Sequence, residues 1–384
     1  MSRGGPLIAL TATALAALLA LLAVSGGSAA LTASSVAGGG GLAATVAAGR
    51  DGAARSDGEA AARGGLGGSS GSLSGARSRA PLKLFIYAGA GNAAAVRAAG
   101  IALGDPRVGA FDYLPGNSWT QLSDPAWLVQ QWSGQSLQLT LAVPLVPVPA
   151  GSGAERAHRG PTDSPPHPAA TPLQGCAGGD ANPYFRALAA RLVAGGLATA
   201  RLVLGFEPLS GLYPWTPRTL RAARDYVDCW RQVHGAMSTV AGAHFSFIWD
   251  IGDPAPGTIP AARLYPGNRY VDEIATSAVD NGCGRVAPAR QWPAQSTLPD
   301  GDDWVARFAR SHHRALAIFM VGLGARDNAS YIRQLLRWAR NHAVSSLDLW
   351  DYGVNGLLRG RYPRALTALR QGCRATREVE RPCA

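Results

Sequence analysis

Eight short runs of apolar and β-branched residues recur between Leu84 and Tyr352, and segments with helical spacing separate most of them. This alternation is typical of parallel strands joined by crossover helices. Eight such units in about 300 residues suit a closed (β/α)8 TIM barrel. We therefore expect residues 81–384 to form one barrel with a C-terminal tail. The predicted strands are Leu84–Ala88, Gly109–Tyr113, Leu137–Val146, Arg201–Phe206, His244–Asp250, Val271–Ser277, Ala315–Val321 and Ser346–Tyr352.

Four segments between these strands carry apolar residues at three- and four-residue spacing, which predicts helices. They are Pro183–Ala194, Pro217–Val240, Asp302–His312 and Ala329–His342, and a last helix near Pro363–Gln371 would complete the eight units. Two irregular stretches, Pro147–Pro172 and Ala287–Asp300, follow the third and sixth strands. We interpret them as loop insertions on the C-terminal face of the barrel, where barrel enzymes place their sites. His158 and His167 in the first insertion are interpreted as surface residues.

The first 80 residues are not expected to contribute to the barrel. Arg3 precedes an apolar run from Leu7 to Val24, and small residues follow at 28–30, where a signal peptidase could cut. Residues 1–30 are therefore predicted to be a signal peptide or, because the run approaches the roughly 20 residues that span a bilayer, a membrane anchor. Residues 31–80 are mostly Gly, Ala and Ser without any aromatic residue, which predicts a disordered linker. The expected location is secreted or extracytoplasmic, with or without an anchor.

The net charge of +11 is spread along the chain in arginines, and Lys83 is the single lysine. No block of five or six like charges occurs, so we expect no nucleic-acid partner. At most, this charge supports a modest attraction to acidic polysaccharides or lipid surfaces.

The five cysteines lie far apart and form no CxxC pair, so neither a zinc site nor another cofactor is predicted. In an oxidising compartment four of them could pair, and a bond from Cys373 to Cys383 would hold the C-terminal tail. Sequence leaves the pairing open. The cysteines are Cys176, Cys229, Cys283, Cys373 and Cys383.

The fourth predicted strand is followed by the most informative segment of the chain, Gly205-Phe206-Glu207, whose loop continues to Tyr213-Pro214-Trp215. A carboxyl group at the C-terminal end of a barrel strand, with Tyr and Trp in the same loop, places a proton donor beside rings that can stack on sugars. The ordinary alternative is a buried Glu paired with an Arg.

This segment resembles glycoside hydrolase family 26, the mannanase-type barrel enzymes, whose acid/base Glu ends strand four in a run close to W/H-E-x-N-G-x-W-Y/F-P-W. Gly205, Glu207, Tyr213, Pro214 and Trp215 match that run, whereas Phe206, Leu209, Ser210 and Leu212 depart from it. The resemblance extends over residues 83–352. Tyr87-Ala88-Gly89, Trp119, Trp127, Val143-Pro144, Phe247-Ile248-Trp249-Asp250 and Tyr265-Pro266-Gly267-Asn268-Arg269-Tyr270-Val271-Asp272 also carry it. It implies a polysaccharide as substrate or ligand and Glu207 as the general acid/base.

The chain departs from the family at strand seven, where the family reads like K-P-L-A-L-P-E-W-G and its Glu is the nucleophile. Met320 stands at the corresponding position, and no Glu occurs between Glu273 and Glu378. A thioether cannot form the glycosyl-enzyme intermediate of a retaining mechanism. An inverting mechanism needs only a second carboxylate that activates water. Asp250 is the first candidate for that base, and Asp280, Asp348 and Asp351 are the others.

Several aromatic residues near the predicted strand ends could bind sugar rings. The candidates are Tyr213, Trp215, Trp119, Trp249, Trp350 and Tyr352, with Trp292 as a further one. Trp338 has helical spacing with Leu335 and is assigned to the core. No G-x-S-x-G motif is present, so serine-hydrolase chemistry has no support.

Three functional hypotheses follow. The first is a glycosidase that acts on a β-linked polysaccharide, with Glu207 as general acid and an Asp, such as Asp250, as base. The second is a catalytically inactive barrel that binds glycan and takes part in exopolysaccharide assembly or export. The third is a structural or partner-binding barrel with no sugar site.

Overall fold

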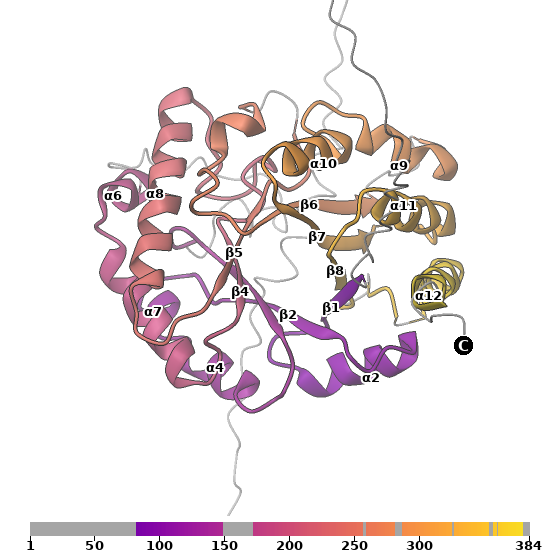
Figure 1. Ribbon diagram of the computed structural model, residues 1–384, viewed down its shortest axis with the longest axis horizontal. Coiled ribbons are helices and arrows are strands. Elements are labelled where there is room, and N and C mark those ends of the chain that lie inside the picture. Colours follow the sequence, from indigo (N-terminus) through magenta and orange to yellow (C-terminus); the bar gives the residue numbers. More distant parts are fainter. Residues whose placement is uncertain are drawn as a thin grey trace, which may run out of the picture. The chain divides into compact units, whose positions relative to one another are not determined.

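The computed structural model describes residues 82–148, 172–255, 259–280, 286–324, 326–352, 356–358 and 360–378. The predicted signal or anchor, the linker, His158, His167, Cys283 and Cys383 lie outside them. Eight parallel strands close into a barrel in sequence order (Figure 1), which confirms the (β/α)8 fold. They are β1 Lys83–Tyr87, β2 Gly109–Tyr113, β3 Leu139–Val143, β4 Arg201–Leu204, β5 Ser246–Asp250, β6 Glu273–Asp280, β7 Ala315–Leu323 and β8 Ser346–Trp350.

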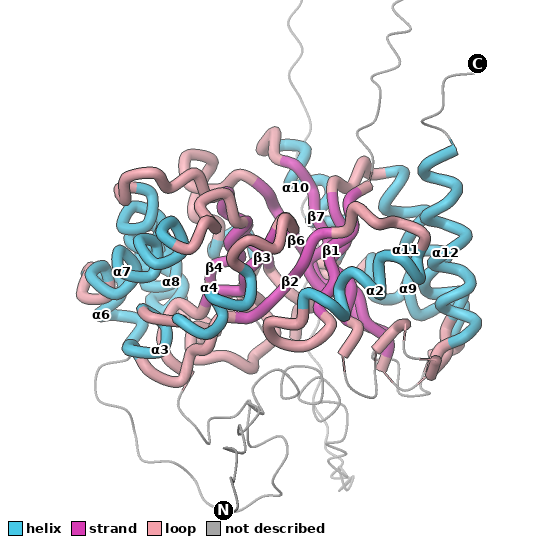
Figure 2. Tube along the Cα trace, turned by 90° about the horizontal axis from the view of Figure 1, so that it is seen from below, coloured by secondary structure: helices cyan, strands magenta, loops and turns pink. Residues whose placement is uncertain are grey.

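Helices surround the strands on both sides in the second view (Figure 2). They are α2 Ala93–Leu103, α3 Trp119–Ser123, α4 Ala126–Trp132, α6 Pro172–Gly178, α7 Asn182–Ala194, α8 Leu220–Ser238, η1 Ala261–Leu264, α9 Pro288–Ser296, α10 Asp302–Ser311, α11 Ala329–Asn341 and α12 Pro363–Glu378. None of the described helices is both long enough and apolar enough to cross a membrane. The Leu7–Val24 run lies outside the described residues.

The stretch Ala287–Asp300 was expected to be irregular, and this expectation is wrong because it contains α9. The helix begins with Pro288 in its first turn, where the N–H group that a proline lacks would have no partner within the helix. It also accommodates Pro293. Only Trp292, Gln295 and Ser296 are buried on it, so the apolar periodicity that would reveal a helix is missing.

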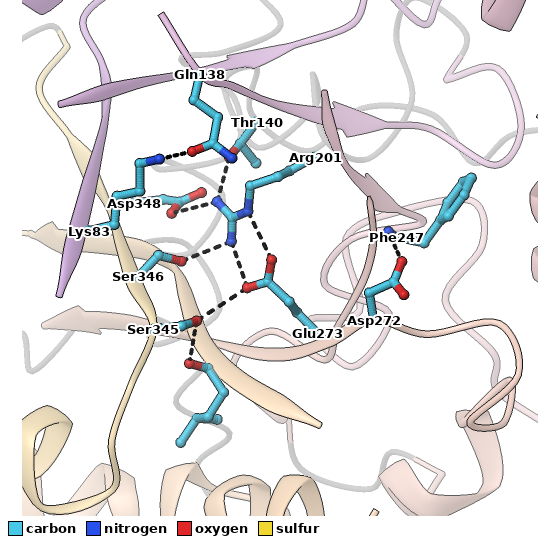
Figure 3. Close-up of polar contacts among 11 residues, drawn as sticks. Lys83, Gln138, Thr140, Arg201, Phe247, Asp272, Glu273, Ser345, Ser346 and Asp348 are labelled. Atoms are coloured by element: carbon cyan, nitrogen blue, oxygen red, sulfur yellow. Dashed lines mark hydrogen bonds and ion pairs between the residues drawn. The ribbon is translucent and has the colours of Figure 1, made fainter. Parts of the chain in front are cut away.

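The N-terminal ends of the strands enclose a buried ionic network centred on Arg201 (Figure 3). Its guanidinium donates to both carboxylate oxygens of Glu273 at 3.0 and 2.9 Å and to the hydroxyls of Thr140 and Ser346. Asp348 lies 3.7 Å away as a second anionic partner. Because Arg201 comes from β4 and its partners from β3, β6 and β8, this network joins the barrel across its interior.

An aromatic layer fills the barrel interior above this network. Its rings contact one another with centroid separations of 4.7–6.4 Å. The rings come from β1, β2, β7 and β8 and from the segment after β4. They are Tyr87, Phe111, Tyr113, Phe206, Phe319 and Trp350. The inner positions on each strand alternate with outer positions that pack on helices, as the two-residue period of a strand requires.

One disulfide joins Cys176 on α6 to Cys229 on α8 and closes a loop of 53 residues. It ties together two helices on one side of the barrel. The predicted bond from Cys373 to Cys383 involves a residue outside the described part of the chain.

Candidate functional site

Glu207 lies three residues beyond β4 in a turn with an unusual backbone. Gly205 has a φ of 53° and Glu207 a φ of 50°, which is a left-handed conformation that a non-glycine residue rarely adopts. Such a conformation persists when the surroundings hold it in place. The Glu207 N–H donates to Asp250 Oδ2 at 3.0 Å, and its carbonyl accepts bonds from the N–H and the hydroxyl of Ser210.

Gly252 supports the same turn from the loop after β5. A Cβ atom at this position would lie 2.7 Å from both Cα and Cβ of Glu207. Real Cβ contacts are not that short, and the φ of 70° at Gly252 disfavours a side chain as well. The two loops therefore meet at a position where only glycine fits.

The Glu207 side chain is 2% exposed. Its Oε1 accepts a long hydrogen bond of 3.4 Å from the Ser277 hydroxyl of β6, and its Oε2 has no hydrogen-bond partner among the described residues. Burial, and secondarily the charge of Asp250, raise the pKa of Glu207 to about 8, although the hydroxyls of Tyr213 and Ser277 oppose this shift. The carboxyl group is therefore largely protonated at neutral pH and can donate a proton or a hydrogen bond.

Asp250, the predicted base, lies at the end of β5 and is fully buried. Its Oδ2 accepts the Glu207 N–H, and the Gly252 N–H also stabilises the carboxylate. Burial nevertheless raises its pKa to about 7. Oδ1 has no hydrogen-bond partner among the described residues. The observed contacts make Asp250 a positioning residue for Glu207.

The other three candidate bases are engaged elsewhere. Asp280 accepts from Asn328 at 2.7 Å and lies 3.7 Å from Arg326. Asp348 belongs to the Arg201 network at the opposite end of the strands. Asp351 accepts the Leu358 N–H at 2.7 Å and is 5% exposed. Each carboxylate therefore has a structural partner.

Met320 lies on β7, next to the β6 residue that bonds to Glu207. It pairs in register with Ser277, which bonds to Glu207. The register of β6 and β7 shifts just before this pair and leaves Phe319 as an extra residue. Because of this bulge, both Phe319 and Met320 contact the interior: Phe319 packs on Phe111, and the Tyr113 hydroxyl lies 3.8 Å from the Met320 sulfur.

Tyr213 is a predicted aromatic residue that interacts with Glu207. It is partly exposed, its hydroxyl interacts with Glu207, and its ring packs edge-on against Phe206 at 4.8 Å. Trp215 stacks on the Tyr213 ring in parallel, with centroids 4.7 Å apart. Trp215 is itself fully buried and donates its indole N–H to the Phe206 carbonyl at 2.8 Å, so in this structure it supports Tyr213 from behind.

Trp350 and Tyr352 lie at the end of β8. Trp350 is fully buried against Tyr87 in the aromatic layer, and its indole N–H donates to the Tyr352 carbonyl at 3.1 Å. Tyr352 is partly exposed and packs edge-on against Tyr87. Of these two, only Tyr352 presents ring surface outward.

The remaining tryptophan candidates pack on aromatic residues of other elements, and their role as sugar platforms stays a prediction. Trp249 faces the helical layer, where it packs on Tyr265 and Phe308. It neighbours Asp250 on a strand, and adjacent strand residues point to opposite faces. Trp119 stacks on Tyr184 of α7 at 5.0 Å. Trp292 packs between helices on Trp338, which confirms the assignment of Trp338 to the core.

Tyr113 and Ser277 contact the candidate site but were not expected from sequence. Tyr113 reaches Met320, and Ser277 reaches Glu207. Both occupy inner positions at strand ends, and the alternation along β2 and β6 could have identified them. No group of three or more His, Cys, Asp or Glu residues in the described ranges has a metal-binding arrangement.

Neither a family model nor a curated protein matches the sequence. Solved structures do match. The YdhT protein from Bacillus subtilis is 13% identical, with a TM-score of 0.50 over 75% of this chain and 84% of that one. The Cellulomonas fimi endo-β-1,4-mannanase double mutant is also 13% identical, with a TM-score of 0.50 over 74% of this chain and 70% of that one. A GH26 β-mannanase from Bacteroides ovatus is 10% identical, with a TM-score of 0.48, and covers 78% of this chain and 90% of its own.

The chain has the same barrel fold. At 13% identity the likeness shows the fold alone. The function therefore has to be argued from the residues around Glu207.

Proposed function

We propose that this protein is a glycosidase-type barrel that binds a β-linked polysaccharide at the C-terminal ends of its strands and does not hydrolyse it by double displacement. One observation carries this proposal. Ser277, which bonds to the buried Glu207 carboxyl group, has Met320 and not a carboxylate as its register partner on β7, and the nearby carboxylate of Asp250 accepts the Glu207 N–H. Glycosyl transfer to the protein requires a carboxylate nucleophile about 5 Å from the acid.

Glu207 supports binding because it is uncharged at neutral pH. With a pKa of about 8, it presents an O–H donor and a carbonyl acceptor to a sugar hydroxyl without the desolvation cost of an ion. Tyr213 and Tyr352, both partly exposed, can pack on sugar faces, as aromatic rings commonly do in carbohydrate sites. Backing by Trp215 and Trp350 fixes the position of these rings.

A location outside the cytoplasm agrees with the Cys176–Cys229 disulfide, because such bonds persist in oxidising compartments. The apolar run near the N-terminus agrees with export as well. A glycan-binding barrel in this location fits a role in assembly or export of an exopolysaccharide.

An inverting glycosidase is the second candidate function, and two observations favour it. A pKa near 8 is what a general acid needs at neutral pH, and Asp250 retains a carboxylate oxygen without a partner. In this alternative, Glu207 protonates the leaving oxygen and Asp250 activates water.

Binding and hydrolysis are measured on the same purified protein. Galactomannan, xylan and mixed-linkage β-glucan are tested by affinity electrophoresis and by release of reducing ends. Tyr213→Ala should weaken binding about tenfold, in line with the loss of an aromatic contact. Tyr184→Ala, which removes an exposed tyrosine on α7, is the matched control and should leave binding unchanged.

Glu207→Gln separates the two functions. The proposal expects no reducing ends from either the wild type or this variant, while both bind glycan. If the wild type releases reducing ends, and both Glu207→Gln and Asp250→Asn abolish this release, the result would establish the inverting glycosidase. Absence of binding to all three polysaccharides at millimolar sugar would overturn both.

A further inference from the structure

Ion pairs neutralise arginines on some helices of the barrel and not on others. Two neighbouring helices, α10 and α11, carry five arginines that we call the arginine face: Arg307, Arg310, Arg333, Arg337 and Arg340. Figure 1 shows α10 and α11 on one flank, with α6, α7 and α8 on the other. The contact from the Trp338 indole N–H of α11 to Asp303 of α10, at 2.7 Å, confirms that the two helices are adjacent.

The arginines on α11 point in one direction. Residues 333, 337 and 340 are spaced four and three apart, which places them on one side of a helix along about 10 Å of its length. Arg333 and Arg337 are exposed, and Arg340 is partly exposed. The buried side of α11 is formed by Tyr331, Ile332, Leu335, Leu336, Trp338 and Ala339. These arginines are therefore not needed to pack the helix.

No ion pair neutralises the arginine face among the described residues. The acidic residues of α10 are Asp302, which is buried, and Asp303, which accepts the Trp338 indole. The α11 segment contains none. Excess positive potential also reaches His342 at the end of α11. Burial lowers the pKa of this imidazole, Asp303 opposes the shift, and Arg310 and Arg307 lower the pKa further.

The opposite flank carries the same number of arginines, but ion pairs neutralise two of them. The arginines of α7 and α8 are Arg186, Arg191, Arg221, Arg224 and Arg231. Arg231 lies 3.5 Å from Asp228 of the same helix, and Arg191 lies 3.1 Å from Asp124. The two flanks therefore differ in their ion pairs and not in their number of arginines.

We propose that the arginine face binds an anionic polysaccharide, a polymer that carries carboxylate or phosphate groups. Guanidinium groups pair with both anions through two parallel hydrogen bonds, and a row of them on two helices matches a polymer better than a single small anion. A membrane surface is the less suitable partner because peripheral helices insert apolar side chains. The exposed large apolar residues of the described chain are Ile101, Trp127, Tyr184, Leu220 and Leu298, none of which belongs to α10 or α11.

This inference does not depend on the site around Glu207. The arginine face lies on the outer helices, whereas Glu207 is buried at the strand ends. The two surfaces could bind the same polymer or different ones, and loss of one should leave the other intact.

The test measures binding of the full protein to polygalacturonate, with uncharged dextran as the reference, in a series of salt concentrations. The triple variant Arg333→Gln/Arg337→Gln/Arg340→Gln should bind polygalacturonate about tenfold more weakly, with a shallower salt dependence. The control variant Arg186→Gln/Arg221→Gln/Arg224→Gln loses the same charge from exposed positions on α7 and α8. It should change affinity less than about threefold.

Equal weakening by both triple variants would show that net charge alone governs binding, and it would overturn the proposal. Absence of binding to polygalacturonate at low salt would also overturn it. The proposal would also be overturned if the protein bound phosphatidylglycerol vesicles through the α11 arginines and did not bind the polymer. If the first variant melts at a lower temperature than the wild type, Arg307→Gln/Arg310→Gln tests the same face from α10.

Discussion

Replacement of Glu207 by Gln should make the protein more stable, and the gain should grow with pH. The pKa of the carboxyl group is about 8 in the folded chain, against 4.5 when it is exposed. Between these values the folded state binds more protons than the unfolded state, so the free energy of unfolding falls as pH rises. At about 1.4 kcal/mol per pH unit, this penalty is about 1 kcal/mol at pH 5, about 3 kcal/mol at pH 7 and about 5 kcal/mol at pH 9.

Gln keeps the size of the side chain and an acceptor for the Ser277 hydroxyl, but it does not ionise. We therefore expect the stability of Glu207→Gln relative to wild type to increase by about 4 kcal/mol between pH 5 and pH 9. Urea denaturation followed by tryptophan fluorescence measures this difference. The gain reflects removal of a carboxyl group that must take up a proton when the chain folds, a group that stability alone would not retain.

Asp228→Asn is the matched control, because Asp228 has a side-chain exposure of 55% and lies on the surface of α8. Its stability should follow that of the wild type across the pH range. A difference between Glu207→Gln and wild type that stays constant from pH 5 to pH 9 would refute the argument. It would mean that Glu207 titrates near its ordinary value, and the case for a neutral donor at this site would fail with it.

The other predictions concern the elements that hold the barrel and the site. Arg201→Met leaves Glu273 and Asp348 buried without their cation and should cost about 3–5 kcal/mol in urea denaturation, less at low pH where the carboxylates are protonated. Gly252→Ala should destabilise the chain by about 1–3 kcal/mol and weaken glycan binding, because the new methyl group collides with Glu207. Reduction of the disulfide at Cys176 should lower stability by about 2–4 kcal/mol, measured with and without dithiothreitol, because it closes a 53-residue loop.

The sequence was sufficient to predict the barrel because each strand is a short buried run with its own pattern. All eight predicted strands overlap observed ones, and β2 Gly109–Tyr113 has the predicted bounds. The helices that sequence missed include α2 Ala93–Leu103, α9, with two prolines and little apolar periodicity, and short segments such as α3 Trp119–Ser123. α2 had a local signal, an alanine-rich run after the Asn92 cap, whereas α9 and α3 lack a clear apolar period.

The site was predicted less completely, and the reason is geometric. Trp249 and Asp250 were both assigned to the site, although neighbours on a strand face opposite sides. Asp250 faces inward and contacts Glu207, while Trp249 packs outward on Phe308. The bulge at Phe319 has the opposite effect, since it brings two successive residues inward. A period of two would have placed only one of them there.

The two ends of the barrel treat buried charge differently. At the N-terminal end, Arg201 lies within ion-pair distance of two carboxylates and also satisfies two hydroxyl groups. At the C-terminal end, Glu207 and Asp250 have no cationic partner among the described residues. Burial raises the pKa of both, as it also raises the pKa of Asp348 beside Arg201.

Arg201 shows that the chain can supply a buried guanidinium group where stability requires one. The absence of such a group near Glu207 is therefore a property of the site around Glu207. Perturbed carboxyl groups without compensation are typical of functional sites, and barrel enzymes have theirs at the C-terminal face. Under the proposed function, Met320 leaves Glu207 without a nucleophile on β7, while burial raises the pKa of Glu207 and leaves its carboxyl group able to donate a hydrogen bond to a sugar.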